Sequence, residues 1–458
     1  MVVIAARLPS AAGPGPRCDD GGVRSILGKV ANFLANVWGI VKFVGSCLLS
    51  PITIPLVAWR AAVNFSLAKS RVAAFCHQIE ALDAGVSPSP PYDRLGRIDA
   101  GDDVFISSDL HRCFRGRRDW LGVQDVKELY VALLDHYDRQ GAHLVENGDI
   151  EDFWMVGGSP YGQAYDLIRG VLYFIPGRGG LELRRALFGR HLQRIVENNL
   201  LSYLRIARRF APAGRYHRVV GNHDDVFLDP VLSTELARHL GGVEPTDWVV
   251  LARPDGSAAA VITHGHQTDG WNAPGRSGLG NFATWVGNTV SDVPGLEAPE
   301  SVPRRSLTLD LLAGRLRNHL LTVSDTFGTN TGYDSLDEER LFDAIGGASD
   351  SGPWLIFGHT HLPVFQPLSR TGVPWYRYAN SGSGIWNGMI TGIEWDGATQ
   401  TPRVVAWLWA DQEDTAGFTE GNVVAERNGR PVARIVLEAD TGGRHLRAPA
   451  RRGVSSPG

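Results

Sequence analysis

The chain has 458 residues, of which 43% are hydrophobic and 21% charged, and its formal net charge is −4. This size and composition predict a globular protein with a large core and more than one structural unit, and the acidic balance argues against a general nucleic-acid-binding surface. The four cysteines (Cys18, Cys47, Cys76 and Cys113) show no CxxC spacing, so they indicate neither a disulfide framework nor a cysteine metal site, and we expect a cytoplasmic protein.

The first part of the chain differs in composition from the rest. Residues 1–24 are rich in Gly, Ala and Pro and predict a flexible leader. They lack the order of charged, apolar and cleavage regions that a secretory signal has. Residues 25–84, and 26–65 above all, are apolar and predict a helical arm.

The most apolar stretch of this arm leaves three interpretations open. Phe43–Trp59 carries no charge over 17 residues and is flanked by Lys42 and Arg60. This length is at the lower limit for spanning a bilayer, and Pro51 and Pro55 interrupt a helix. The arm therefore packs on the core, or lies at a membrane surface as a peripheral or re-entrant anchor, or spans the membrane.

Residues 85–98 are rich in Pro and Ser and predict a linker, after which strands and helices alternate over residues 99–440. Residues 270–350 predict an insertion that is partly helical around 306–322 and forms either a lid or a peripheral decoration. Residues 441–458 predict a disordered basic tail. Helical periodicity covers 123–139 and 181–210, and we expect strands at 103–108, 143–147, 216–220, 258–263, 355–357, 376–380, 390–395, 403–409 and 432–438.

Metal-binding residue types follow five of these strands. Each pattern alone has a structural explanation, since an Asp after a strand often caps a helix and Asn-His and Gly-Asp are common turn dipeptides. Five such patterns at successive strand ends make coincidence a poor explanation, because open α/β sheets place ligands at the carboxyl ends of their strands. They are Asp109-x-His111, Gly148-Asp149, Asn222-His223, His264 and His359-x-His361.

Mixed imidazole and carboxylate ligands suit divalent first-row ions. A carboxylate can bridge two such ions, and an amide oxygen completes a site without further negative charge. Paired ions hold phosphate oxygens and activate water for an in-line displacement. The ligand set therefore predicts two divalent metal ions, chosen from Mn, Fe, Zn or Co, and phosphoester chemistry.

With these motifs, the sequence resembles the calcineurin-like metallophosphoesterases over roughly residues 103–385, apart from the insertion. The resemblance implies an α/β (α+β) fold, a four-layer αββα sandwich, with a dinuclear metal site at the strand ends. The matching motifs are D-x-H at Asp109/His111, G-D-x-x-[DE] at Gly148–Asp152, G-N-H-[DE] at Gly221–Asp224, H-G at His264 and G-H-x-H at Gly358–His361.

The resemblance also implies a role for each residue. Asp109, His111, Asp149 and His361 would hold the first ion, and Asp149, Asn222, His264 and His359 the second, with Asp149 as the bridge. His223 would protonate the leaving group or steady the phosphate. Asp224 would orient His223, and Asp152 is expected behind the ligands. His266 has no secure counterpart, and we expect a supporting or substrate contact.

The motifs depart from those of the serine/threonine protein phosphatases, because Phe153 and Trp154 follow Asp152 and Val220 precedes Gly221. The sequence is more similar to the phosphodiesterase and pyrophosphatase branches, and loosely to the UDP-diacylglucosamine diphosphatases. Arg112 and Arg115 either clamp a second phosphate, as bidentate donors, or form a solvated basic turn.

We therefore expect a hydrolase acting on a phosphodiester, pyrophosphate or phosphomonoester, in a phosphorylated small molecule or lipid-linked substrate; nucleic acid fits the charge poorly. The alternative is a catalytically silent module of the same fold that binds a membrane or partner through residues 26–65.

Overall fold

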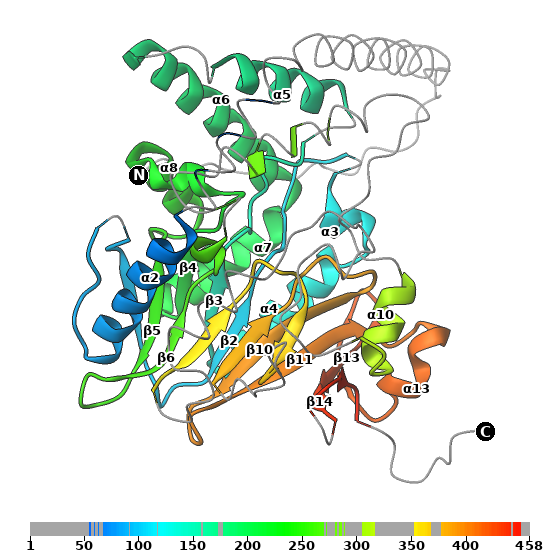
Figure 1. Cartoon of the computed structure of the whole chain (residues 1–458). Helices are drawn as coiled ribbons and strands as arrows, with labels where there is room; N and C mark the ends of the chain where they lie inside the picture. Colours follow the sequence, from blue (N-terminus) through cyan, green and yellow to red (C-terminus); the bar gives the residue numbers. More distant parts are fainter. Residues whose placement is uncertain are drawn as a thin grey trace, which may run out of the picture.

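The computed structural model describes residues 67–90, 92–116, 118–156, 159–172, 177–269, 305–316, 352–367, 377–440 and 443–449, with the single positions 55, 59, 63, 272, 280, 281, 284, 285 and 288. Two large mixed sheets and the helices around them make up this part of the chain (Figure 1). The expected leader (1–24), most of the apolar stretch (26–65) and most of the insertion (270–350) lie outside the described residues.

The larger sheet has seven strands in the order β12-β13-β11-β10-β2-β3-β4. The three strands β2, β3 and β4 run parallel, whereas the pairings from β2 through β10, β11 and β13 to β12 are antiparallel. The bounds are β2 Val104–Ser107, β3 His143–Asn147, β4 Tyr216–Val219, β10 Met389–Asp396, β11 Thr401–Trp409, β12 Val423–Arg427 and β13 Arg430–Val436.

The second sheet has six strands in the order β1-β5-β6-β7-β9-β8. In it β6, β7 and β9 run parallel, which places the residues after β6 and β7 at one edge. The bounds are β1 Leu95–Asp99, β5 Trp248–Ala252, β6 Ala258–Ile262, β7 Trp354–Phe357, β8 Pro363–Phe365 and β9 Tyr378–Ser381, and a small separate pair consists of β14 Glu438–Ala439 and β15 Leu446–Arg447.

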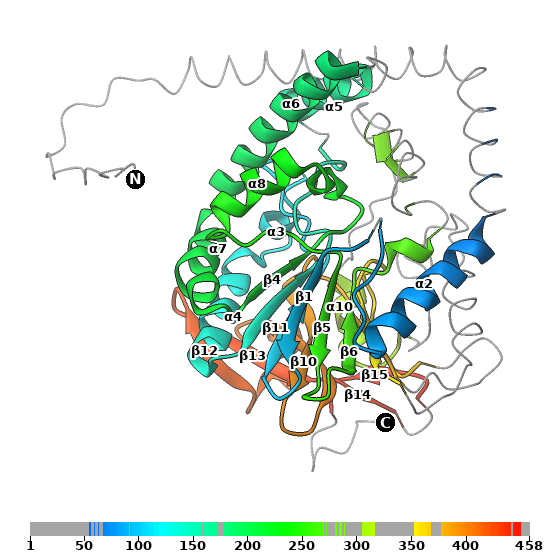
Figure 2. The same cartoon turned by 90° about the vertical axis from the view of Figure 1, so that its left-hand side faces the viewer.

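Helices cover the outer faces of the sheets (Figure 2). Helix α4 packs on β10, β11 and β3 of the larger sheet, and α2 packs on β6 of the smaller one. Helices α5 and α6 contact each other, and α6 also contacts α8 and α7. The bounds are α2 Ala68–Asp83, α3 Trp120–Val123, α4 Lys127–Gln140, α5 Pro160–Leu172, α6 Gly177–Asn198, α7 Leu200–Arg205, α8 Pro230–His239, α10 Arg305–Leu312 and α13 Ala416–Thr419, with short turns η1 Ile206–Phe210, η2 Ala211–Ala213, η3 Asp225–Leu228, η4 His266–Thr268 and η5 Glu413–Thr415.

Alternate residues of the central strands enter two different cores. In β2, Ile106 joins the core between the two sheets, whereas Phe105 joins the core under α4. Val145 and Leu144 of β3 divide in the same way. Side chains of a strand alternate between its faces, and both faces are covered here, so these strands are continuous apolar runs in the sequence.

Most of the expected strands and helices have counterparts, but two boundary predictions were wrong. Leu95–Asp99 of the expected linker forms β1, which pairs in parallel with β5. In the expected disordered tail, Leu446–Arg447 pairs with β14, and Leu446 is buried in the core between the sheets. Strands β5, β8 and β12 were not predicted at all.

Of the apolar arm, the structure describes helix α2. This helix buries Val72, Phe75, Ile79 and Leu82 in the core that includes the smaller sheet. The ring of Phe75 lies 5.2 Å from that of Trp248 and 5.9 Å from that of Phe357. No helix among the described residues has the length and apolar character required to cross a membrane.

Candidate metal centre

The carboxyl ends of five strands from both sheets meet at one site. Strands β2, β3 and β4 lead into the segments that carry Asp109/His111, Asp149 and Asn222/His223. Strands β6 and β7 lead into His264 and His359/His361. Seven candidate ligands are thereby brought together. Six of them form two neighbouring groups, and a third group of His111, Asp152 and His223 shares His111 with the first.

The first group consists of Asp109, His111 and His361. Each residue offers one ligand atom, and these atoms lie within 4.8 Å of one another. The Nε2 atoms of His111 and His361 are 3.1 Å apart, and His361 Nε2 lies 3.2 Å from Oδ1 of Asp109. That carboxylate oxygen is buried, and His361 is its only polar partner among the described residues.

The second group contains Asp149, His264 and His359, with ligand atoms again within 4.8 Å of one another. Nε2 of His264 lies 3.3 Å from Oδ2 of Asp149 and 3.2 Å from Oδ1 of Asn222. Burial opposes ionisation of Asp149, but the imidazoles of His264 and His223 hold the pKa of this carboxyl well below its usual value. The site therefore presents a carboxylate, an amide oxygen and two imidazoles.

The hydrogen bonds of Nδ1 in His111 and His264 fix Nε2 as the ring nitrogen that faces the site. Nδ1 of His111 lies 3.1 Å from Oδ2 of Asp152, and Nδ1 of His264 lies 2.9 Å from the carbonyl oxygen of Asn147. Because a carboxylate and a carbonyl accept hydrogen bonds, each Nδ1 donates, and Nε2 is the ring nitrogen that faces the site and can bind a cation once it has lost its proton. This is the usual arrangement behind a metal-bound histidine.

The backbone of the site is unusual as well. Nine non-glycine residues of the described chain have a positive φ, and five of them are candidate ligands. Such conformations cost about 1–3 kcal/mol each and persist where the surroundings impose them, often at functional sites. The five are Asp109 (51°), His111 (45°), Asp149 (51°), His359 (69°) and His361 (60°).

Glycines precede the ligands because neighbouring ligands pack against the backbone there. A Cβ on Gly221 would overlap the carboxylate and amide nitrogen of Asp149. A Cβ on Gly148 would overlap the ring of His264. The Gly-Asp and Gly-Asn-His patterns therefore reflect close contact between strand ends as well as the chemistry of the ligands.

His223 lies beside the two groups. Its backbone nitrogen donates to Oδ1 of Asp149 (2.8 Å), and its Nδ1 lies 3.1 Å from Oδ1 of Asp152. The ring of Trp154 lies against it, with centroids 4.5 Å apart. Burial lowers the pKa of His223, but the charges of Asp152 and Asp149 outweigh it and raise this pKa to about 9.

The expected role of Asp224 was wrong, because Asp152 and not Asp224 contacts the His223 ring. Asp224 is fully buried, forms an ion pair with Arg218 and accepts hydrogen bonds from the backbone nitrogens of Ile150 (2.9 Å) and Gly221 (2.6 Å). It thus connects the loops that follow β3 and β4. The side chain of the residue after His223 faces away from it, which sequence spacing alone did not reveal.

The expected phosphate clamp was also wrong for Arg112. This side chain is fully buried and donates to Glu146 (2.5 Å), with Glu151 3.6 Å away. Its guanidinium is therefore occupied inside the protein. Arg115 is exposed, and its part in substrate binding stays a prediction.

Two further residues lie next to the second group. His266 is buried, with its ring 5.2 Å from that of His264 and 6.3 Å from that of His359. Asp269 Oδ2 lies 3.0 Å from Nε2 of His359. Sequence reasoning missed Asp269, although it stands only five residues after His264, and it missed Trp154, two residues after Asp152.

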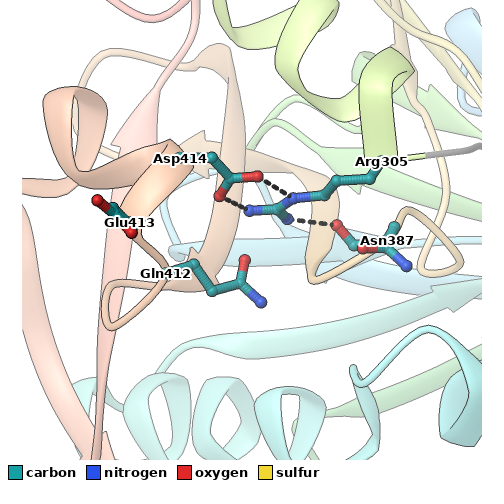
Figure 3. Close-up of a pocket in the computed structure, with 5 residues that line it drawn as sticks. All are labelled: Arg305, Asn387, Gln412, Glu413 and Asp414. Carbon is teal, nitrogen blue, oxygen red and sulfur yellow. Dashed lines mark hydrogen bonds and ion pairs between the residues drawn. The ribbon is translucent and has the colours of Figure 1, made fainter.

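A separate pocket of about 680 Å³ lies between α10 and η5 (Figure 3). Arg305 extends across it, pairs with Asp414 through two nitrogens and donates to the carbonyl oxygen of Asn387 (2.8 Å). The guanidinium is thus already satisfied, and none of the candidate ligands lines this pocket. We assign it no part in the site.

Comparison with models of known protein families gives no match for this chain, and comparison with curated proteins gives none either.

Proposed function

We propose that the protein is a metal-dependent hydrolase of phosphoester bonds, of the calcineurin-like metallophosphoesterase type. The observation that carries this proposal is the pair of buried ligand groups, one with Asp109, His111 and His361 and the other with Asp149, His264 and His359. The scissile bond would be a phosphodiester, pyrophosphate or phosphomonoester, in a phosphorylated small molecule or a lipid-linked substrate.

The arrangement of layers supports the family's four-layer sandwich. Helix α2 lies on the smaller sheet, the two sheets share one apolar core, and α4 lies on the far face of the larger sheet. Because fold does not decide function, the side chains at the strand ends carry the argument.

The donor set fits two divalent cations such as Mn, Fe, Zn or Co. Three observations support this. The Nε2 atoms of His111 and His361 face each other, and the buried Oδ1 of Asp109 has only His361 beside it among the described residues. The Nδ1 atoms of His111 and His264 face acceptors away from the site. Asp109, His111 and His361 would hold one ion, Asn222, His264 and His359 the other, and Asp149 would bridge them. When bound, the cations would supply the Lewis acidity that polarises a phosphate and activates water.

The protein's own groups account for the remaining steps. Asp152 accepts a hydrogen bond from Nδ1 of His223, so the proton available to substrate is the one on Nε2. In the metal-free protein the raised pKa of His223 keeps that proton in place near neutral pH. We assign His223 the transfer of this proton to the departing oxygen, or its donation to a phosphate oxygen in the transition state. Trp154 covers one side of the ring and limits its motion.

An activity screen tests the proposal. The purified full chain, supplied with Mn²⁺, is assayed on aryl phosphomonoesters and diesters, nucleotide diphosphate sugars, phospholipid head groups and cyclic nucleotides. At least one class should be hydrolysed, and Asp149→Ala and His223→Ala should each lose activity by at least about a hundredfold. The matched control His77→Ala changes an exposed histidine on α2 and should remain fully active. A metal-loaded wild-type protein that is inert on the whole panel would leave the silent module as the better explanation.

A further inference from the structure

Helix α5 (Pro160–Leu172) exposes an apolar face to the surface of the described protein. Its exposed residues Pro160, Ala164, Ile168 and Val171 are all apolar and lie at intervals of four, four and three residues, along one face. The side chains of Ile168 and Val171 are 45% and 52% exposed. A surface helix normally turns such a face toward the core.

The inward face of the same helix carries three polar residues beside the buried Tyr165 and Leu172. Gln163, Asp166 and Arg169 are buried there, and Arg169 forms an ion pair with Asp166 at 2.7 Å. Arg169 also donates to the carbonyl oxygen of Phe153 (3.1 Å), next to the Trp154 that lies on His223. Arg169 on the inward face therefore holds a segment of the candidate site, and the exposed apolar residues join no core cluster of the described residues.

The neighbouring side of helix α6 extends this surface with one leucine and two arginines, and the exposed Glu197 follows one turn beyond Arg194. Leu183, Arg190 and Arg194 recur at intervals of seven and four residues, so they lie on one side of α6. The guanidinium of Arg194 lies 3.8 Å from the ring centroid of Tyr161, which places that side against α5. Leu183 is 54% exposed, and within the described part of the chain no carboxylate pairs with Arg190.

We infer that the apolar face of α5 and the adjoining side of α6 bind the surface of an anionic lipid bilayer. This lipid-docking surface consists of Pro160, Ala164, Ile168, Val171, Leu183 and Arg190. An apolar helical strip beside arginines is the combination that lies in a membrane interface: the aliphatic groups enter the acyl boundary while guanidinium groups pair with headgroup phosphates.

The inference does not depend on the proposed catalysis, although it would complement it. The inner face of α5 holds the Phe153–Trp154 segment that contacts His223. A bilayer docked on the outer face would therefore lie one helix away from the candidate site. Phosphate groups of lipids or lipid-linked molecules would then be near it.

Sedimentation of the full chain with vesicles tests the inference. Wild-type protein should bind vesicles of phosphatidylcholine mixed with phosphatidylglycerol, and added salt should weaken this binding. Ile168→Asp/Val171→Asp should weaken it by at least about tenfold, because two aliphatic groups that would enter the bilayer are replaced by charges that the headgroups repel. The matched control Val123→Asp/Val231→Asp changes two valines with similar exposure, 56% and 52%, and should bind like the wild type.

Two further variants separate docking from misfolding and report on charge. Ile168→Leu/Val171→Leu keeps the apolar face and should restore binding, and all variants should melt at the wild-type temperature. Arg190→Glu should weaken binding to the anionic vesicles by about fivefold or more. The inference is overturned if the Asp double variant binds like the wild type, which would assign the anchor to residues 26–65. Absence of wild-type binding, or equal binding to vesicles of phosphatidylcholine alone, would overturn it as well.

Discussion

At the scale of single residues, Asp152 links a candidate ligand to the candidate proton donor. Its Oδ2 faces Nδ1 of His111 and its Oδ1 faces Nδ1 of His223, both at 3.1 Å. Two backbone nitrogens, of Trp154 and Met155, also donate to Oδ1. Burial disfavours its charge, but His223 and His111 keep the pKa of Asp152 well below its usual value. One carboxylate therefore orients two imidazoles.

The first prediction concerns Asp152→Asn, which keeps the shape and removes the charge. Activity should fall about 10–100-fold, the usual effect of losing such a partner behind a metal site. The pKa of His223 should also drop from about 9 in metal-free protein, because burial lowers it and the largest charge that opposes burial, that of Asp152, is removed while those of Asp149 and Asp224 remain. NMR titration of the His223 ring checks this shift. The control Asp255→Asn lies on an exposed turn and should change neither quantity.

The second prediction separates His359 from His361. Because the two rings lie in different ligand groups, His359→Ala should weaken one ion and His361→Ala the other. Metal analysis after limited loading, combined with spectroscopy of a Co²⁺-substituted protein, should give two different deficits. Identical spectra and identical metal content in the two variants would contradict the two-group assignment.

At the scale of elements, the strands that carry the ligands could be predicted and their surroundings could not. Strands such as β6 and β7 are covered on both faces, so they appear in the sequence as apolar runs before His264 and His359. Strand β1 escaped prediction because it is half-exposed and contains polar residues. The partners of Asp224 and Arg112 depend on the path of the loops. That path includes left-handed residues such as Asp109 and His111, a conformation that is uncommon for any residue other than glycine.

The third prediction tests the close contact between strand ends. A methyl group on Gly221 would overlap Asp149, so Gly221→Ala should displace that carboxylate and weaken metal binding at least about tenfold. Gly189→Ala is the matched control, because a Cβ there meets nothing within 4 Å in the middle of α6. It should leave metal binding unchanged and stabilise the protein by about 0.5–1 kcal/mol. Metal titration and thermal melting measure both effects.

The fourth prediction concerns the α5–α6 pair in acid. Burial lowers the pKa of His191 from 6.5 to about 4, and its Nε2 lies 3.1 Å from the carbonyl oxygen of Asp152. Between these two pH values the unfolded chain binds a proton that the folded protein does not, so the free energy of unfolding should fall as pH decreases from 6.5 to 4. The loss should be about 3 kcal/mol. His191→Gln should show less of this loss in denaturant titrations, and an equal loss would contradict the assignment.

At the scale of the whole molecule, carboxylates outnumber cations in the buried region between the strand ends and α4. Arg112 and Arg218 pair with Glu146, Glu151 and Asp224. Within the described chain, Asp109, Asp149 and Asp152 have only histidines as ionic partners. Buried charges without compensation are strongly destabilising. The fold thus depends either on protonated imidazoles or on bound cations at this place.

The fifth prediction follows from that dependence. In metal-free protein, burial lowers the pKa of His223 and of His264. The neighbouring carboxylates outweigh burial and raise both pKa values to about 9. Their stabilisation should be complete below the unfolded value of about 6.5 and lost as pH rises through 9. The melting temperature of metal-free protein should therefore fall over this range.

Saturating Mn²⁺ should raise the melting temperature at pH 8 by about 5 °C or more, because cations bound only to the folded state replace the imidazolium charges. Above pH 6.5 the metal-loaded curve should fall less steeply than the metal-free one, because a ligated His264 carries no proton to lose whereas His223 still does. Asp149→Asn should remove most of the metal-dependent rise. Calorimetry with and without chelator measures the rise in melting temperature, its pH dependence and the effect of Asp149→Asn. Parallel pH curves for metal-free and metal-loaded protein would show that Asp109, Asp149 and Asp152 are balanced by something other than a bound cation.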